Sequence, residues 1–506
     1  MKQAYHKPGY TRFLLAILAL LLVTSSIADT APERRYVRLT ILHTNDTHSH
    51  LLPFNYPSVV IVEGETINLP VHKNVGGIAR RAALINRIRA EREPGVLVLD
   101  AGDVIDGSPF SIEFAGEADV AAMNAAGYEV MVTGNHEYSN SLKDFLKRNQ
   151  EARFPVLGAN VLRSDGTPFL TPYVVITEDG LRVAILGLVD PNNYQAVREG
   201  ALVIKDPVAV AREWVPKLRE QADAVILLTH IGHKEDKRLA ERVPGIDAIV
   251  GGHSHTRVEI PVLVKRDERP NAFWVGGTVV AQDFQWGTDL GCLDLIFRKG
   301  DWGWTLMSYG GRLITVTSDI PEDPSVRAVV EKYHEKIAPK YDVVLCQATA
   351  DFLQEAAANL VSDALRETYD GEFAVHNYGG VRTDLVQGPI TAGDIANLFP
   401  FGNTTMTFQA AGDQINEILR VHRPAVSNIR YRVEGDKLVF AELGGHPIEA
   451  DRVYKGVTHS FFASNCFPKE INTTDTGLTT RDVIVEYVKG KKTISPDNER
   501  RAHFPR

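Results

Sequence analysis

The stretch VRLTILHTNDTH, residues 37–48, decides the fold, because an apolar run ends on Asp46 and His48, two side chains that can bind a metal ion. Short apolar runs bounded by Gly or Asp are typical of strands buried on both faces. Four later stretches have the same order: Asp103 follows residues 96–99, Asn135 follows 130–132, His230 follows 224–228, and His253 and His255 follow 246–250. Ligands gather beyond the carboxyl ends of strands in open α/β sheets, so we expect these side chains to converge.

The length and the first residues of the chain predict two domains behind a secretory leader. At 506 residues the chain exceeds the roughly 250–300 residues at which a single core stops growing. Residues 1–28 carry basic but no acidic side chains, an apolar run over 13–23 and a small-residue stop, which predicts a signal peptide cleaved after Ala28. The alternative is a membrane anchor, but this run is shorter than the roughly 20 residues that cross a bilayer. We therefore expect no membrane span and a secreted or periplasmic protein.

The charge and the cysteines exclude two classes of protein. The formal charge is −9 at pH 7, so general electrostatics will not hold a nucleic acid polymer, and an anionic small molecule would need a local positive site. Cys292, Cys346 and Cys466 are too few for the disulfide framework of a small secreted protein. At most one bridge is possible, and we expect Cys292 and Cys346 to be buried free thiols. The sequence leaves the oligomeric state open.

The pattern along the chain predicts two α/β units joined by a helix. Residues 36–315 alternate apolar runs with amphipathic segments of helical period. Residues 320–339 predict a linker helix, with Pro324 in its first turn and Pro339 as its stop. Residues 340–506 then form the second unit, with one long helix and several short strands.

The residue types at the ends of the apolar runs suit a pair of divalent cations. Two such ions about 3.5–4 Å apart can hold both the attacking and the leaving oxygen of a phosphoryl displacement. Asp103 can bridge the ions because a carboxylate has two oxygens. Asp46 and His48 are two residues apart, as are His253 and His255, so each pair points the same way if the chain is still extended there. Any one of these residues alone would suit a turn or a helix cap, but the whole set favours a metal site.

These motifs, taken in order, resemble the calcineurin-like metallophosphoesterases, and more closely their secreted 5′-nucleotidase branch. The matching segments extend over nearly the whole chain beyond the leader: Leu42-His43-Thr44-Asn45-Asp46-Thr47-His48, Asn74-Val75-Gly76-Gly77, Ala101-Gly102-Asp103, Gly134-Asn135-His136-Glu137, Thr229-His230, Gly251-Gly252-His253-Ser254-His255, Asn377-Tyr378-Gly379-Gly380-Val381-Arg382 and Pro400-Phe401-Gly402-Asn403. The resemblance implies an α/β fold: an N-terminal four-layer metallophosphoesterase β-sandwich flanked by helices, a linker helix, and a C-terminal α/β 5′-nucleotidase domain that binds the substrate.

The resemblance also implies the ligands of two metal ions. One ion would be held by Asp46, His48, Asp103 and His255, and the other by Asp103, Asn135, His230 and His253. Mixed nitrogen and oxygen ligands suit zinc, manganese, cobalt or iron, and metal availability decides among these ions more than affinity does. His43, His50 and His233 lie among the motifs without matching a ligand position, and we expect them to be supporting or surface residues.

His136 is the catalytic residue that the resemblance implies. A metal-bound water, its pKa lowered toward ~7, would attack phosphorus in line with the departing oxygen. His136 would stabilise the transition state or give a proton to that oxygen, whereas the alternative is a packed histidine that caps the next helix. In many 5′-nucleotidases an aspartate three residues further on orients this histidine, but here the position holds Ser139. A serine carries no charge, so we expect weaker support for an imidazolium.

Residues of the second unit match the substrate-binding positions of the family: Asn377, Gly380, Arg382, Phe401, Asn403 and Phe461. Arg382 can grip phosphate oxygens with two donors. Phe401 and Phe461 would sandwich a base, for which stacking contributes roughly 1–3 kcal/mol, although core packing is the alternative for both. Two departures favour a broader or altered substrate range. The loop after Phe461 is shortened to Ser464-Asn465-Cys466-Phe467, and Leu353 stands where an arginine is common.

The function that the sequence favours is hydrolysis of nucleoside 5′-monophosphates to nucleoside and phosphate by a secreted two-metal enzyme. A 2′,3′-cyclic nucleotide phosphodiesterase or a UDP-sugar hydrolase would use the same chemistry on another substrate. A third alternative is an inactive nucleotide-binding protein, and the complete set of ligand residues argues against it.

Overall fold

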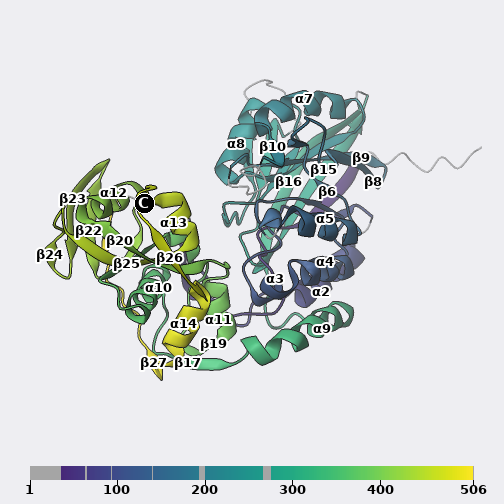
Figure 1. Ribbon diagram of the computed structural model, residues 1–506. Helices are drawn as coiled ribbons and strands as arrows, with labels where there is room; N and C mark the ends of the chain where they lie inside the picture. Colours follow the sequence, from purple (N-terminus) through teal and green to yellow (C-terminus); the bar gives the residue numbers. More distant parts are fainter. Residues whose placement is uncertain are drawn as a thin grey trace, which may run out of the picture.

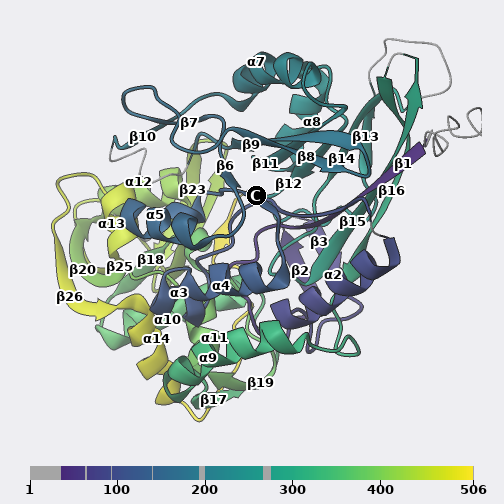
Figure 2. The same ribbon diagram turned by 90° about the vertical axis from the view of Figure 1, so that its right-hand side faces the viewer.

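Two lobes make up the protein, one purple to teal and the other green to yellow in Figure 1, and Figure 2 shows them from the side. The computed structural model describes residues 36–62, 65–92, 94–139, 141–192, 200–265, 275–301 and 303–504. The predicted signal peptide, residues 1–28, lies outside these residues. Among the described residues, no helix is both long enough and apolar enough to cross a membrane.

Two six-stranded sheets form the middle of the first lobe. The first sheet has the order β16 (Gly303–Thr315), β15 (Asp289–Gly300), β1 (Tyr36–Thr44), β4 (Val96–Asp100), β5 (Val130–Val132) and β6 (Val156–Leu157). The second has the order β13 (Val262–Lys265), β14 (Gly277–Ala281), β12 (Ala248–Gly251), β11 (Ala224–His230), β9 (Leu181–Val189) and β8 (Tyr173–Glu178). Strands β1, β4, β5 and β6 are parallel, as are β9, β11, β12 and β14, so the carboxyl ends of each set meet at one edge.

Helices cover the outer face of each sheet. The helices of this lobe are α2 (Ile78–Arg92), α3 (Pro109–Phe114), α4 (Glu117–Ala126), α5 (Leu142–Glu151), α7 (Pro207–Arg219) and α8 (His233–Arg242), with the short helix η2 (His136–Tyr138). The described part of this lobe also contains two short strand pairs: β2 (Val59–Val62) with β3 (Glu65–Asn68), and β7 (Val161–Arg163) with β10 (Leu202–Ile204).

Alternating side chains explain why the central strands are apolar throughout. In β4, Leu97 and Leu99 pack in the core between the two sheets, whereas Val96 and Val98 pack against α2 and α4. The second sheet buries its own outer face against α7 and α8. Successive strand residues point to opposite faces, so a strand buried on both faces needs an unbroken apolar run. The predicted four-layer sandwich flanked by helices is confirmed.

A single helix, α9 (Pro324–Tyr341), leads to the second lobe. Its first turn matches the prediction: Pro324 opens the helix, and the Asp323 side chain accepts hydrogen bonds from the backbone N–H groups of Ser325 and Val326. The prediction that Pro339 ends the helix is wrong, because the helix continues to Tyr341. A proline removes one backbone donor, and in the last turn the loss is small because the helix bonds resume at once. The N–H of Asp342 bonds to the Ala338 carbonyl at 3.0 Å.

The second lobe is also α/β, as predicted. Its largest sheet has the order β21 (Ala425–Ser427), β18 (Phe373–His376), β25 (Val453–His459), β20 (Thr404–Ala411) and β26 (Thr473–Thr479). The smaller sheets are β19 (Gly388–Thr391), β17 (Val344–Ala348) and β27 (Thr493–Ile494), and β24 (His446–Pro447), β23 (Lys437–Leu443), β22 (Ile429–Glu434) and β28 (Ala502–His503). The helices are α10 (Gln354–Thr368), η3 (Tyr378–Gly380), α11 (Ala392–Leu398), α12 (Gly412–His422), α13 (Ser460–Cys466) and α14 (Thr480–Lys489). Cys292 and Cys346 are buried free thiols, as expected, and Cys466 is a half-buried one.

Candidate functional site

The side chains singled out as metal ligands all lie at the carboxyl ends of parallel strands of the first lobe. Asp46 and His48 follow β1, Asp103 follows β4, Asn135 follows β5, His230 ends β11, and His253 and His255 follow β12. The first three strands belong to one sheet and the last two to the other. The structure therefore brings residues from both sheets to one edge of the sandwich.

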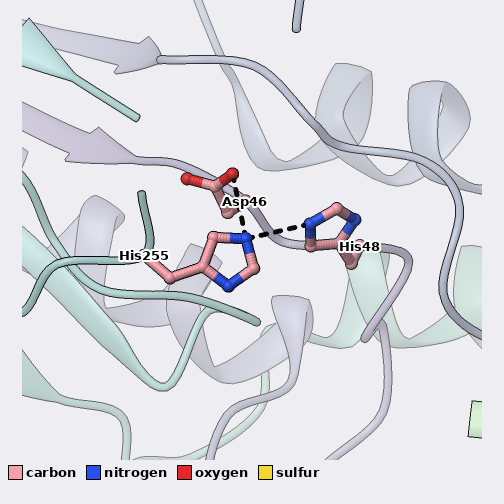
Figure 3. Close-up of side chains that lie close together, drawn as sticks. All are labelled: Asp46, His48 and His255. Carbon is pink, nitrogen blue, oxygen red and sulfur yellow. Dashed lines mark hydrogen bonds and ion pairs between the residues drawn. The ribbon is translucent and has the colours of Figure 1, made fainter. Parts of the chain in front are cut away.

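Two clusters made only of predicted ligands form at this edge, and His48 and Asp103 also form a third group with His136. Figure 3 shows the first, in which His255 Nε2 lies 3.3 Å from both Asp46 Oδ1 and His48 Nε2. In the second cluster, His230 Nε2 lies 3.0 Å from Asp103 Oδ2 and 3.3 Å from His253 Nδ1. Each cluster keeps its ligand atoms within 4.8 Å of one another, which suits a bound cation.

The paired ligands converge for a different reason from the one predicted, which was an extended chain at each pair. Strand β1 ends at Thr44, and Asp46 and His48 have φ of 50° and 45°. His253 and His255 likewise have φ of 81° and 54°. These residues lie in the left-handed region, which is uncommon for residues other than glycine and often marks a functional site. Tight left-handed loops, rather than the alternation of a strand, turn the side chains of each pair toward the site.

The hydrogen bonds of the first cluster leave lone pairs facing one another. His48 Nδ1 donates to the carbonyl of Asp106 at 2.7 Å, and His255 Nδ1 donates to the side-chain oxygen of Gln285. With the proton on Nδ1 in both rings, the two Nε2 atoms present lone pairs to each other across 3.3 Å. Asp46 Oδ2 accepts from Asn45 Nδ2 at 2.7 Å, while Oδ1 accepts no hydrogen bond from the described residues. A cation among these acceptors would satisfy all of them.

The second cluster favours positive charge as well. Burial lowers the pKa of His230, but the charges of Asp103 and Asp46 and the hydrogen bond to Asp103 outweigh burial and raise the pKa to about 10. A cation held by Asp103 and His230 would supply this charge in place of the proton. Asn135 Oδ1 is buried and has no hydrogen-bond donor within the described parts of the chain, so it is free to be a ligand. The donor set, buried carboxylate and amide oxygens with histidine nitrogens, therefore fits divalent cations.

Several supporting residues hold the ligand loops together. Glu137 accepts from the backbone N–H groups of Val104 at 2.7 Å and Asp103 at 3.1 Å, and also from that of Gly134. It thereby ties the loop after β4 to the loop after β5. The motif that contains Glu137 indicates no role for it, and Gln285 has no local sequence pattern that could have revealed it.

The three histidines set apart from the ligands lie outside both clusters. His43 packs against Gly291 within the sheet, and burial lowers the pKa of its imidazole to about 4. His50 stacks on Trp286 with ring centres 4.6 Å apart. His233 begins α8 and is half-buried. His43 and His50 are buried supporting residues rather than surface residues.

His136 has a charged partner, so the expectation of weaker support at this position is wrong. Its Nδ1 lies 2.7 Å from Asp106 Oδ2, whereas the Ser139 hydroxyl is 3.4 Å away. Burial lowers the pKa of His136, but the Asp103 charge and the hydrogen bond and charge of Asp106 outweigh it and raise the pKa. Asp106 lies three residues beyond Asp103, but its separation of 30 residues from His136 hid the pairing from a sequence reading.

A cavity of about 1000 Å³ separates the two lobes at this edge. One wall is formed by first-lobe residues, among them Asp103, Asp106, Asn135, His136, Ser139, His253 and His255. The opposite wall contains every second-lobe residue predicted to bind substrate: Asn377, Gly380, Arg382, Phe401, Asn403 and Phe461. Asp46, His48 and His230 are buried behind the first wall. Arg481, which no sequence motif marks, also lines the cavity and donates to the carbonyl of Pro400 at 2.9 Å.

The second-lobe residues are presented by short turns and helix ends. Arg382 follows η3, where a Cβ on Gly380 would meet the Phe399 ring at 2.8 Å, so this turn needs glycine. Phe461 lies in the first turn of α13 and is 41% exposed, whereas Phe462 is buried. The segment expected as a shortened loop is largely helical, because α13 continues to Cys466. The core-packing alternative for Phe461 does not hold, since its side chain lines the cavity.

Known proteins resemble this chain over almost its full length. The calcineurin-like phosphoesterase family matches residues 39–257, and the 5′-nucleotidase C-terminal domain matches residues 340–467. A 5′-nucleotidase of Vibrio cholerae is 27% identical over 535 residues, covering 92% of this chain and 93% of its own. A 5′-nucleotidase of Bos taurus is 29% identical over 547 residues, covering 94% and 92%.

A solved structure has the same architecture. The crystal structure of a 5′-nucleotidase precursor from Thermus thermophilus matches with a TM-score of 0.79 at 29% identity, covering 92% of this chain and 99% of its own. Both lobes and the helix between them are therefore shared. The chain therefore carries a calcineurin-like phosphoesterase domain followed by the C-terminal domain of the 5′-nucleotidases.

Proposed function

We propose that this protein hydrolyses nucleoside 5′-monophosphates to nucleoside and phosphate with the help of two divalent cations. One observation carries the proposal: a single cavity has clustered metal ligands on one wall and Arg382, Phe401 and Phe461 on the other. Metal ions held by these ligands would bind the phosphate, an arginine would pair with its negative charge, and aromatic rings would stack on a base. The full-length similarity to 5′-nucleotidases supports the same substrate class.

The two cations would divide the ligands between them. Asp46, His48 and His255 would hold one, Asn135, His230 and His253 the other, and Asp103 would bridge both. When bound, such cations neutralise phosphate charge and lower the pKa of a water molecule to about 7. The mixed ligands suit zinc, manganese, cobalt or iron.

The remaining steps belong to side chains around the cavity. Arg382 would bind phosphate oxygens with its guanidinium donors, and Asn377 and Asn403 would contact the nucleoside. Phe401 and Phe461 would hold the base. When the bond between phosphorus and the 5′ oxygen breaks, that oxygen would take a proton from His136.

The proposal also includes export of the protein and the boundaries of its domains. The basic, apolar and small-residue pattern of residues 1–28 supports a cleaved leader, and hence a protein that acts outside the cytoplasm. We take 36–315 as the metallophosphoesterase domain, 320–339 as the linker and 340–506 as the substrate-binding domain.

A substrate panel tests the proposal. Phosphate release from AMP, 2′,3′-cyclic AMP, UDP-glucose and ribose 5-phosphate is measured on one purified sample, together with its metal content. We expect AMP to give the highest kcat/KM. Preference for the cyclic nucleotide or for the UDP-sugar would support the corresponding alternative instead. A metal-replete sample that binds AMP without hydrolysing any substrate would identify a nucleotide-binding protein.

A further inference from the structure

The imidazole of His136 lies against a carboxylate from another loop. Asp106 Oδ2 is 2.7 Å from His136 Nδ1, and the two side chains are only 14% and 15% exposed. Asp106 comes from the loop after β4, whereas Ser139 follows His136 on the same short segment. The shorter contact is therefore the one made between loops, and it carries a charge that the serine lacks.

The backbone of Asp106 is fixed on both sides. Its N–H donates to the Ser111 hydroxyl at 2.9 Å, and its carbonyl accepts from His48 Nδ1 at 2.7 Å. Its φ of 70° is a left-handed conformation that the surrounding loop must hold in place. Because the hydrogen bond of His48 goes to the Asp106 carbonyl, a change of the Asp106 side chain removes the hydrogen bond to His136 and keeps the one to His48.

We infer that Asp106 is the positioning residue of His136: its carboxylate accepts the Nδ1–H hydrogen bond and so turns Nε2 toward the substrate cavity. This inference rests on the proposed phosphomonoesterase function. A carboxylate bound to one ring nitrogen fixes the rotation and the tautomer of the ring, and it stabilises the ring when it is positively charged. In this role Asp106 acts through the ring of His136 and takes no part in bond making or breaking.

The proton balance of the step is complete. The bond between phosphorus and the leaving oxygen breaks with its electron pair on that oxygen, which takes the Nε2 proton of His136. The water molecule that attacks forms the new bond to phosphorus and releases one proton, which restores the ring. Throughout, the Nδ1 proton stays on the ring and bonded to Asp106. A leaving group that departs as a stable anion needs no such proton.

This difference between leaving groups distinguishes a positioning role of Asp106 from a merely structural one. A structural contact would alter the loop after β4 and hence metal binding and every substrate alike. Positioning of a proton donor affects only substrates whose leaving group must be protonated. AMP is such a substrate, whereas p-nitrophenyl phosphate releases a stable anion.

The experiment begins with Asp106→Asn, measured on both substrates. We expect kcat with AMP to fall roughly 10²-fold, while kcat with p-nitrophenyl phosphate stays within about threefold. Metal content and melting temperature should equal those of the wild type. Glu213→Gln is the matched control, because it removes an exposed carboxylate on the outer helix α7 and should change neither rate. Equal losses on both substrates, or loss of metal, would overturn the inference.

Two double variants add an independent criterion. In a His136→Ala background, Asp106→Asn should cause no further loss with AMP, because the residue acts through the ring. In Asp106→Ser with Ser139→Asp the carboxylate moves to the other neighbour of Nδ1, and we expect at least a roughly tenfold recovery over Asp106→Ser alone. A further loss in the first case, or no recovery in the second, contradicts positioning. A wild-type protein inactive on AMP would instead refute the proposed function, so the two failures are distinguishable.

Discussion

The two walls of the cavity are built in different ways. In and behind the first wall, Asp46, Asp103 and His230 are almost fully buried, and each has a second side-chain atom bonded to the protein. On the second wall, Phe461 is 41% exposed and stands on the first turn of a short helix. Buried, bonded groups are preorganised for a single geometry, whereas exposed side chains can be exchanged at little cost to the fold. We therefore expect the first wall to determine the reaction and the second to determine which molecule undergoes it.

The largest expected effect comes from the first wall. Asp103→Asn removes the charge that faces His230 and that would bridge both cations. We expect kcat to fall at least ~10³-fold, because cation binding contributes several kcal/mol to the transition state. The measurement is the rate with AMP at saturating substrate, together with metal content.

A carboxylate far from the cavity provides the control. Asp165→Asn alters an exposed turn of the first lobe and should leave rate and metal content unchanged. If Asp103→Asn retained the wild-type rate, the first wall would not determine the reaction, and the nucleotide-binding alternative would be preferred.

A smaller, selective effect comes from the second wall. Phe461→Ala should raise KM for AMP roughly 5- to 150-fold, since stacking on one aromatic ring contributes about 1–3 kcal/mol per base. Ribose 5-phosphate, which has no base, serves as the control substrate and should keep its KM. Similar changes for both substrates would show that Phe461 supports the fold of the wall rather than the base.

The prediction with the smallest effect on catalysis concerns the stability of the second wall at low pH. His459 precedes Phe461, and its Nδ1 accepts from the N–H of Phe462 at the start of α13. Burial, with a smaller contribution from the charge of His376, lowers the pKa of His459 to about 3. The unfolded chain therefore takes up the proton first, so stability is lost as pH falls from about 6.5 toward 3, by up to about 1.4 kcal/mol per pH unit.

His459→Asn tests this dependence, because asparagine caps helices well and stays neutral. Melting temperatures of both proteins are compared between about pH 7 and about pH 4, since an unfolded histidine titrates within roughly this range. The wild type should lose more stability than the variant as the pH falls. Parallel curves would mean that His459 is not held neutral in the folded protein.

The first wall could be predicted further from the sequence than the second. Apolar runs mark buried strands, and parallel strands end at a common edge, so Asp46, Asp103 and His230 were identified from local patterns alone. The backbone conformation of the loops that join each strand to its ligands could not be predicted, because the left-handed φ of His48 and His255 depends on loop packing. A non-local pairing such as Asp106 with His136 leaves no periodic signal at all.

The second wall was identified by resemblance rather than by pattern. Arg382 and Phe461 follow no periodicity, and their positions depend on turns such as the one at Gly380. The residues after Phe461 were expected as a loop, yet they form the end of α13, where the N–H of Phe467 still bonds to the Ala463 carbonyl at 3.2 Å. The place of Arg481 in the cavity wall could not be predicted from the sequence, because Arg481 lies on α14, far from every quoted motif.

The most direct test of the central claim is an anomalous scattering measurement on crystals of the metal-replete protein. Our account predicts two cation peaks at the edge of the sandwich. One should lie among Asp46, His48 and His255, the other among Asn135, His230 and His253, with Asp103 between them. The absence of any peak among these side chains, in crystals that preserve both walls, would contradict it.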